Sequence, residues 1–118
     1  MEQTQMLGKR GEDLAADYLQ RKGYRILARN FRCRRGELDI VAEKGGVLVF
    51  AEVKTRRSLA FGLPGEAVTP KKQIHLLQGA AYYCRTQGIR GMPLRMDVVE
   101  VLFLEEKPYL HHIENAFS

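Results

Sequence analysis

The chain has 118 residues, a formal net charge of +5 and an isoelectric point near 9.4. This length suits one domain over residues 1–118, and the hydrophobic fraction of 45% is ordinary for a globular chain. The positive charge favours a polyanionic partner, but by itself it fits nucleic acid and an acidic membrane surface equally well.

Several classes are excluded at this stage. The two cysteines, Cys33 and Cys84, have no CxxC spacing, which argues against a zinc site and against a disulfide scaffold. The opening MEQTQMLGKRGED has no apolar core, so a signal peptide is not expected. No run approaches the ~18 apolar residues of a membrane span, so we expect no membrane insertion and a cytoplasmic location.

Residues 4–22 are predicted to form a helix that ends at Gly23. Its apolar residues recur at spacings of three, four and seven: Leu7, Leu14, Ala15, Tyr18 and Leu19. Glu12 does not fit this pattern, because it points along the small, apolar side of the helix. It is either a solvated residue at the border of that side or a carboxylate that leans over a sheet.

A first strand is predicted over residues 24–31, followed by a basic loop over residues 32–35. The loop contains Arg32, Arg34 and Arg35, which are candidates for contacts to phosphate groups. A solvated loop is the alternative.

Residues 36–55 are predicted to form a β-hairpin. The pair Gly45-Gly46 lies between two β-rich runs, which is typical of a two-residue turn. In this register Lys44 pairs with Val47.

The same register places Asp39 opposite Glu52 and Glu37 opposite Lys54, with all four side chains on one face. A four-residue turn at residues 43–46 is the alternative, and it makes Asp39 diagonal to Glu52 instead.

Two opposed carboxylates repel each other unless a cation lies between them. Asp39 and Glu52 therefore predict a Mg²⁺ site, with Lys54 placed to neutralise charge or to position a water molecule. An ordinary solvated strand face is the alternative, although Leu48 and Phe50 share this face and make it half apolar.

A second helix is predicted from Thr69 and Pro70 to about Gln87, with Gly88 as its end. Gln73 is predicted to point inward, because it aligns with three apolar or small residues: Leu77, Ala80 and Cys84. It is either a core residue with a hydrogen-bond partner or a group that holds water or phosphate beside the site.

Residues 56–66, between the hairpin and this helix, are predicted to form a loop that faces the substrate. Arg56 and Arg57 in this loop, and Lys71 and Lys72 at the start of the helix, are further candidates for nucleic-acid contacts.

Residues 94–104 are predicted to form a strand, in which Asp97 has a structural role and pairs with an arginine. The tail over residues 107–118 is ambiguous. If it is extended, His111 and His112 point in opposite directions, which argues against a two-histidine metal site.

The predicted order of helix, three strands, helix and strand resembles the core of the restriction-endonuclease-like fold, the PD-(D/E)XK nuclease superfamily. More narrowly, the chain resembles the bacterial YraN-type family related to archaeal Holliday-junction resolvases. The likeness extends from Leu7 to Phe117. It rests on four motifs: GKRGEDLAADYL with Glu12, GELDIVA with Asp39, FAEVKTR with Glu52, Val53 and Lys54, and TPKKQIHLLQGAAYY with Gln73.

The resemblance implies an α/β (α+β) fold with a central mixed sheet flanked by helices, in the core order αβββαβ. It also implies a Mg²⁺ or Mn²⁺ ion held by Asp39, Glu52, the backbone carbonyl of Val53, and Glu12. Lys54 would orient or help to deprotonate the attacking water, and Gln73 would support the site.

The expected function is that of a divalent-metal-dependent endonuclease acting on DNA, with branched or junction DNA and a homodimeric state implied by the relatives. Leu38 stands where the superfamily's PD pair has proline, a position at which variation is tolerated. The alternative is a non-catalytic nucleic-acid-binding accessory protein on the same fold. A protein-interaction module is a third class.

Overall fold

The computed structural model describes residues 2–34, 36–57 and 68–117. Two helices and five strands follow one another in the order α1(Glu2–Arg21), β1(Arg25–Cys33), β2(Gly36–Lys44), β3(Val47–Arg56), α2(Pro70–Gln87), β4(Leu94–Leu104) and β5(Lys107–Phe117). The strands form one mixed sheet in the order β1-β2-β3-β4-β5. This confirms the expectation of a mixed α+β architecture with a central sheet and flanking helices.

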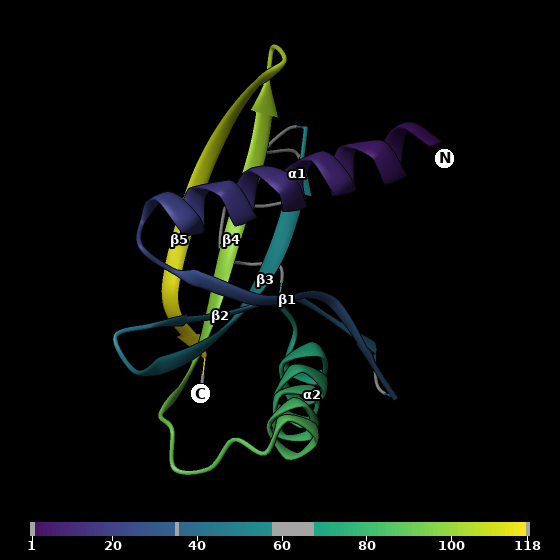
Figure 1. Cartoon of the computed structure of the whole chain (residues 1–118). Coiled ribbons are helices and arrows are strands. Elements are labelled where there is room, and N and C mark those ends of the chain that lie inside the picture. Colours follow the sequence, from purple (N-terminus) through teal and green to yellow (C-terminus); the bar gives the residue numbers. More distant parts are fainter. Residues whose placement is uncertain (1, 35, 58–67, 118) are drawn as a thin grey trace.

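The two helices cover different parts of the sheet (Figure 1). Helix α1 packs against β1, β3 and β4, whereas α2 packs against β1 and β2. Each helix closes its own apolar layer, one around Leu19, Ile40 and Val49, the other around Phe50 and Leu76. Among the described residues, no helix has the length and apolar character needed to cross a membrane.

The β2–β3 hairpin has the register of the two-residue turn. Lys44 pairs with Val47, and the ladder continues to the pair Ile40–Ala51. Gly45 and Gly46 have φ values of 58° and 80°, the left-handed region that glycine adopts without strain. The alternative four-residue turn at residues 43–46 is therefore wrong.

Several predicted boundaries need correction. Strand β1 continues through Arg32 and Cys33, because these residues pair with Glu37 and Gly36, so the first half of the predicted loop at 32–35 belongs to the strand. Arg56 belongs to β3, because it pairs with Leu102, and most of the predicted loop at 56–66 lies outside the described residues.

The tail, ambiguous from its sequence, forms the edge strand β5, which pairs antiparallel with β4. The observed order is therefore αβββαββ, one strand more than the predicted core. Polar residues alternate weakly along this strand because much of it lies exposed at the sheet edge.

Helix α2 begins and ends as the sequence predicts. Thr69 Oγ1 accepts a hydrogen bond from Lys72 N, Pro70 opens the helix, and Gly88 closes it with a φ of 67°. The predicted inward stripe is wrong in part, since Leu77 is 38% exposed. The buried positions are instead Leu76, Gly79, Ala80 and Tyr83.

Gly11 sets the distance between α1 and the sheet. A Cβ atom added at this position would overlap Oγ1 of Thr55 on β3. The absent side chain lets the helix backbone approach the strand, and this approach places the next residue, Glu12, over the sheet.

Asp97 has the structural role expected of it. It is fully buried, and its Oδ2 lies 2.8 Å from Arg95 Nη2 and 2.7 Å from His112 Nε2. Its Oδ1 accepts from the backbone N of Asn115 at 2.9 Å. These contacts tie β5 to β4 and account for the inward direction of His112, whereas His111 is exposed.

We predict that Gly11→Ala lowers the free energy of unfolding by about 1–3 kcal/mol, the usual cost of an overpacked contact. Urea titrations would measure the change. Gly8→Ala is the matched control, because nothing lies within 4 Å of a Cβ added there. It should be neutral or stabilising by up to ~1 kcal/mol. Equal stability of the two variants would contradict the close approach at Thr55.

We predict that Asp97→Asn lowers the free energy of unfolding by about 3–5 kcal/mol at neutral pH, because Arg95 would lose its buried counter-charge and His112 its carboxylate partner. Asp17→Asn removes an exposed carboxylate that pairs with Arg21 and should cost at most ~0.5 kcal/mol.

The pH dependence of stability tests the same network. Burial alone would raise the pKa of Asp97, but hydrogen bonds from His112, Arg95 and the backbone of Asn115 lower it to about 2. The stabilising contribution is therefore complete above the ordinary value of 3.8 and is lost as the pH falls toward 2. Between pH 3.8 and about 2, the free energy of unfolding should therefore fall less in Asp97→Asn than in the parent, as measured by acid titration.

Candidate functional site

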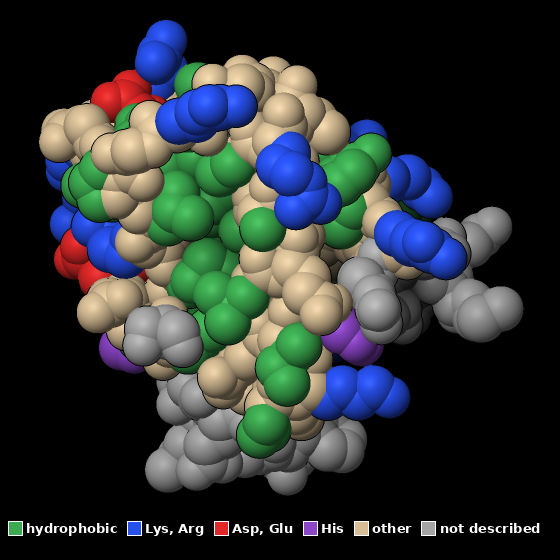
Figure 2. All heavy atoms as spheres, turned by 90° about the horizontal axis from the view of Figure 1, so that it is seen from below, with side chains coloured by type: hydrophobic (Ala, Val, Ile, Leu, Met, Phe, Trp, Pro, Cys, Tyr) green, Lys and Arg blue, Asp and Glu red, His purple; other side chains and the backbone are tan. Residues whose placement is uncertain are grey.

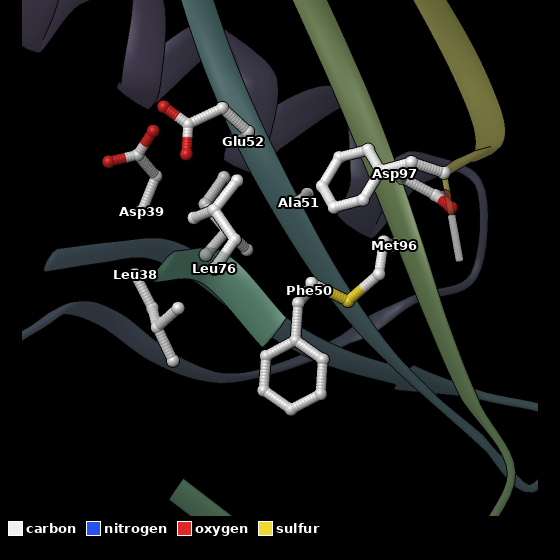
Figure 3. A pocket seen from close by; sticks show the side chains of 10 residues that line it. Leu38, Asp39, Phe50, Ala51, Glu52, Leu76, Met96 and Asp97 are labelled. Atoms are coloured by element: carbon white, nitrogen blue, oxygen red, sulfur yellow. The ribbon is translucent and has the colours of Figure 1, made fainter. Parts of the chain in front are cut away.

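Four carboxylates from three elements converge where α1 crosses the end of the β2–β3 ladder. We call Glu12, Glu37, Asp39 and Glu52 the acidic cluster. Oxygen atoms of Glu12, Glu37 and Asp39 all lie within 4.8 Å of one another. Glu52 is 6% exposed, and its side chain reaches Asp39 from the neighbouring strand (Figure 3).

Asp39 stands where the two hairpin strands separate. Regular pairing ends at Ile40 and Ala51, and beyond it Asp39 Oδ2 accepts a hydrogen bond from Val53 N at 2.9 Å. The side chain thus replaces the missing partner in the ladder. This contact fixes the direction of Asp39 toward Glu52.

Glu52 is the least compensated member of the cluster. Its Oε2 is buried and has no hydrogen-bond partner within the described part of the chain. Burial, followed by the charge of Asp39, raises the pKa of Glu52 to about 7. A buried acceptor without a donor is costly, so this oxygen is available to a ligand.

The pKa values of Asp39 and Glu12 are raised as well. Burial raises the pKa of Asp39 despite the hydrogen bond from Val53. Burial, and then the charges of Asp39 and Glu37, raise the pKa of Glu12. The cluster therefore concentrates negative charge that the surrounding protein only partly neutralises.

Two lysines approach the cluster from different elements. Nζ of Lys54 on β3 and Nζ of Lys72 on α2 each lie 3.7 Å from Glu52 Oε1. Lys54 was predicted here from its spacing to Glu52. Lys72 was predicted only as a contact to nucleic acid, because its approach to Glu52 depends on how α2 docks on the sheet.

Glu37 was predicted to face Lys54, and this is wrong. It lies instead with Glu12 and Asp39, because the strands separate beyond Ile40 and the hairpin register no longer governs its position. With its amide nitrogen turned toward the acids, Asn30 donates to Glu12 Oε1 and to Glu37 Oε1, each at 2.9 Å.

Asn30 is a residue that the sequence analysis missed. It has a φ of 53°, a left-handed conformation that asparagine tolerates better than most residues. An asparagine inside an otherwise apolar and basic strand was the available indication. Its position holds two acids of the cluster in a fixed relation.

Gln73 is not joined to the acidic cluster by any hydrogen bond within the described residues. Its Nε2 donates to the backbone carbonyl of Val68 at 3.1 Å, so its observed contact stabilises the start of α2. This corresponds to the structural alternative for Gln73.

The residues predicted to contact phosphate groups differ in their surroundings. Arg32 and Arg56 are engaged with acids: Arg32 Nε lies 3.9 Å from Glu37 Oε2, and Arg56 Nη2 lies 2.8 Å from Glu100 Oε2. Lys72 is half-exposed beside Glu52. Three others are exposed: Arg34, Arg57 and Lys71. Arg35 lies outside the described residues.

The surface at the lower end of the molecule has mixed character. Seen from below, hydrophobic side chains gather in the middle, Lys and Arg lie along much of the border, and acidic side chains lie at one side (Figure 2). Helix α2 also carries three large apolar side chains that are exposed to solvent: Ile74, Leu77 and Tyr82.

The donor atoms of the acidic cluster suit a hard divalent cation. All are carboxylate oxygens, and one of them, Glu52 Oε2, is buried without a partner. Burial, and then repulsion between the acids, raise these pKa values, and a dication would offset the cost of their negative charge. Mg²⁺ and Mn²⁺ prefer such oxygen ligands, and the residues present fit them.

Comparison with known proteins gives the family. Residues 11–101 match the family described as "Uncharacterised protein family UPF0102". A UPF0102 protein of Geobacter sulfurreducens is 50% identical over 116 residues, which covers 98% of this chain and 91% of the relative. One from Caldicellulosiruptor saccharolyticus is 49% identical over 113 residues, covering 94% and 96%. The chain therefore belongs to the UPF0102 family.

Proposed function

We propose that this protein is a Mg²⁺- or Mn²⁺-dependent endonuclease that hydrolyses phosphodiester bonds in DNA. The observation that carries the proposal is Glu52, a buried carboxylate with an unpartnered oxygen, facing Asp39 and flanked by Lys54 and Lys72. The order of elements, with the parallel β3–β4 pair connected through α2, supports a restriction-endonuclease-like fold.

The ion would be held by Asp39, Glu52, Glu12 and the backbone carbonyl of Val53. When bound, it would supply a water molecule of lowered pKa and stabilise negative charge on the phosphoryl oxygens. Asp39 is pre-oriented for this role by the hydrogen bond from Val53 N, so little conformational freedom is lost on binding.

Lys54 and Lys72 would act on the substrate. Both ammonium groups lie beside Glu52, so a phosphate that approaches the cluster meets two positive charges. Lys54 is assigned to orienting the attacking water, and Lys72 to neutralising the phosphate. Asn30 holds Glu12 and Glu37 in place, and the exposed Arg34, Arg57 and Lys71 lengthen the contact with the nucleic-acid backbone.

A homodimer is part of the proposal through the resemblance to resolvases. Sedimentation equilibrium would distinguish one copy from two.

We predict that the parent protein cleaves DNA in the presence of Mg²⁺ or Mn²⁺, and that Asp39→Asn and Lys54→Ala each reduce the rate by ~10²–10³-fold. DNA and RNA substrates, single-stranded, duplex and branched, would be compared in gel assays. Glu43→Gln is the matched control, because Glu43 pairs with Arg25 away from the cluster, and it should retain activity.

Equal cleavage by the parent and by both site variants would trace the activity to a contaminant and contradict the assignment. No cleavage by the parent, together with salt-sensitive binding, would favour the non-catalytic accessory protein.

We predict that Mg²⁺ raises the melting temperature of the parent at pH 8 and that Glu52→Gln abolishes this rise. A ligand at ~100 times its Kd stabilises a protein by about 2.7 kcal/mol, which corresponds to a shift of several degrees. Glu43→Gln should respond like the parent. An identical shift in Glu52→Gln would exclude Glu52 as a ligand.

Without metal, the direction in which stability changes with pH can be predicted. The raised pKa of Glu52 means that the native state holds a proton more tightly than the unfolded state. Stability should therefore fall as the pH rises from 4.5 to about 7. Glu52→Gln should lose much of this dependence and be more stable than the parent at pH 8 when EDTA is present.

A further inference from the structure

A second pocket lies beside Lys54, over β3, β4 and β5. Its volume is about 90 Å³, below the ~300–1,000 Å³ of pockets that enclose a whole drug-sized ligand, so it would take only part of a larger molecule. We call it the β5 pocket and define it by Lys54, Arg56, Glu100, Leu102, Tyr109 and His111.

Strand pairing explains why these side chains share one face. Lys54 pairs with Glu100, which pairs with His111, so the three form one row across the sheet. Arg56, Leu102 and Tyr109 form the next row. Helix α2 packs against β1 and β2 (Figure 1), and it contributes none of the described residues that line the pocket.

Glu100 provides a specific polar group in this pocket. Only 6% of its side chain is exposed, and its Oε2 accepts from Arg56 at 2.8 Å. Its Oε1 is buried and has no partner among the residues that the structure describes. A carboxylate only accepts hydrogen bonds, so a ligand that satisfies this oxygen must present an N–H or O–H donor.

The rest of the pocket suits a flat ring. Tyr109 is 55% exposed beside Leu102, so an aromatic ring and an aliphatic side chain lie next to each other without a covering element among the described residues. Exposed aromatic rings of this kind stack on nucleobases with little regard for their sequence.

The pocket also adjoins the acidic cluster. Lys54 belongs to both, because its Nζ lies 3.7 Å from Glu52 Oε1 and its side chain lines the pocket. A nucleotide with its ring in the pocket can therefore place its own phosphate at Lys54, the group assigned above to hydrolysis.

We propose that the β5 pocket binds one unpaired nucleobase of the nucleic-acid substrate, stacked on Tyr109 and hydrogen-bonded to Glu100 Oε1. This deepens the proposed function and rests on it for the identity of the polymer. The base donates through its Watson–Crick edge, so it must be single-stranded or extruded from a duplex. Guanine, adenine and cytosine have amino donors on this edge, whereas the single donor of thymine lies between two carbonyls that a carboxylate repels.

The test is binding of fluorescein-labelled oligonucleotides, measured by anisotropy in EDTA so that no cleavage occurs. One strand is a mixed sequence, and the other has the same number of phosphates with abasic sugars throughout. The parent should bind the normal strand more tightly. Tyr109→Ala should weaken binding of that strand about 5–100-fold and leave the abasic strand unchanged.

Matched variants separate the pocket from general effects. Tyr82→Ala removes another exposed tyrosine, on α2, and should bind like the parent. Tyr109→Phe should retain affinity because it keeps the ring. Glu100→Gln should weaken binding of guanine-containing strands more than that of thymine-only strands. If Glu100→Gln does not fold, the Tyr109 variants decide alone.

If the parent and Tyr109→Ala bind the normal strand equally well, the proposal that the β5 pocket binds a nucleobase is wrong, even if the parent cleaves DNA. Tyr109-dependent binding by a parent that shows no hydrolysis supports the pocket and removes the nuclease assignment. The two proposals therefore fail separately.

Discussion

The structure depends on two carboxylates that are held together against their own repulsion. Asp39 and Glu52 meet where the β2–β3 ladder ends, and the backbone N–H of Val53 keeps Asp39 in this position. Burial raises the pKa of both groups, so the fold stores an electrostatic cost at one place. Lys54 and Lys72 reduce this cost without satisfying the second oxygen of Glu52. This uncompensated negative charge is the basis on which we propose a cation at the site.

Much of this arrangement follows from local sequence. The Gly45-Gly46 turn fixes the register as far as Ile40 and Ala51, which brings the next residues, Asp39 and Glu52, near each other. The boundaries of α2 and β4 are equally local, since a proline, a glycine and a run of β-branched residues mark them. These features depend on neighbours in the chain, which is why the sequence predicts them.

The remaining features depend on how distant elements dock. Lys72 reaches Glu52 only because α2 packs on the sheet, and Glu37 turns to Glu12 because the strands separate. The strand β5 has weak alternation, and a buried charge, Asp97, attaches it by binding Asn115 N. None of these contacts has a local pattern, so the predicted partner of Glu37 was wrong and the last strand remained ambiguous.

The connection between β3 and β4 has a consequence for how the protein assembles. The hairpin closes through two residues, whereas the parallel pair forms only after the chain has returned past α2 and placed Leu94 beside Leu48 and Leu102 beside Arg56. Closing a short turn takes microseconds, and non-local pairing is slower. We expect Asp39 and Glu52 to come together early, while water still solvates them. They lose this water only when both helices have packed on the sheet. The last kinetic barrier would then include the dehydration of these charged side chains.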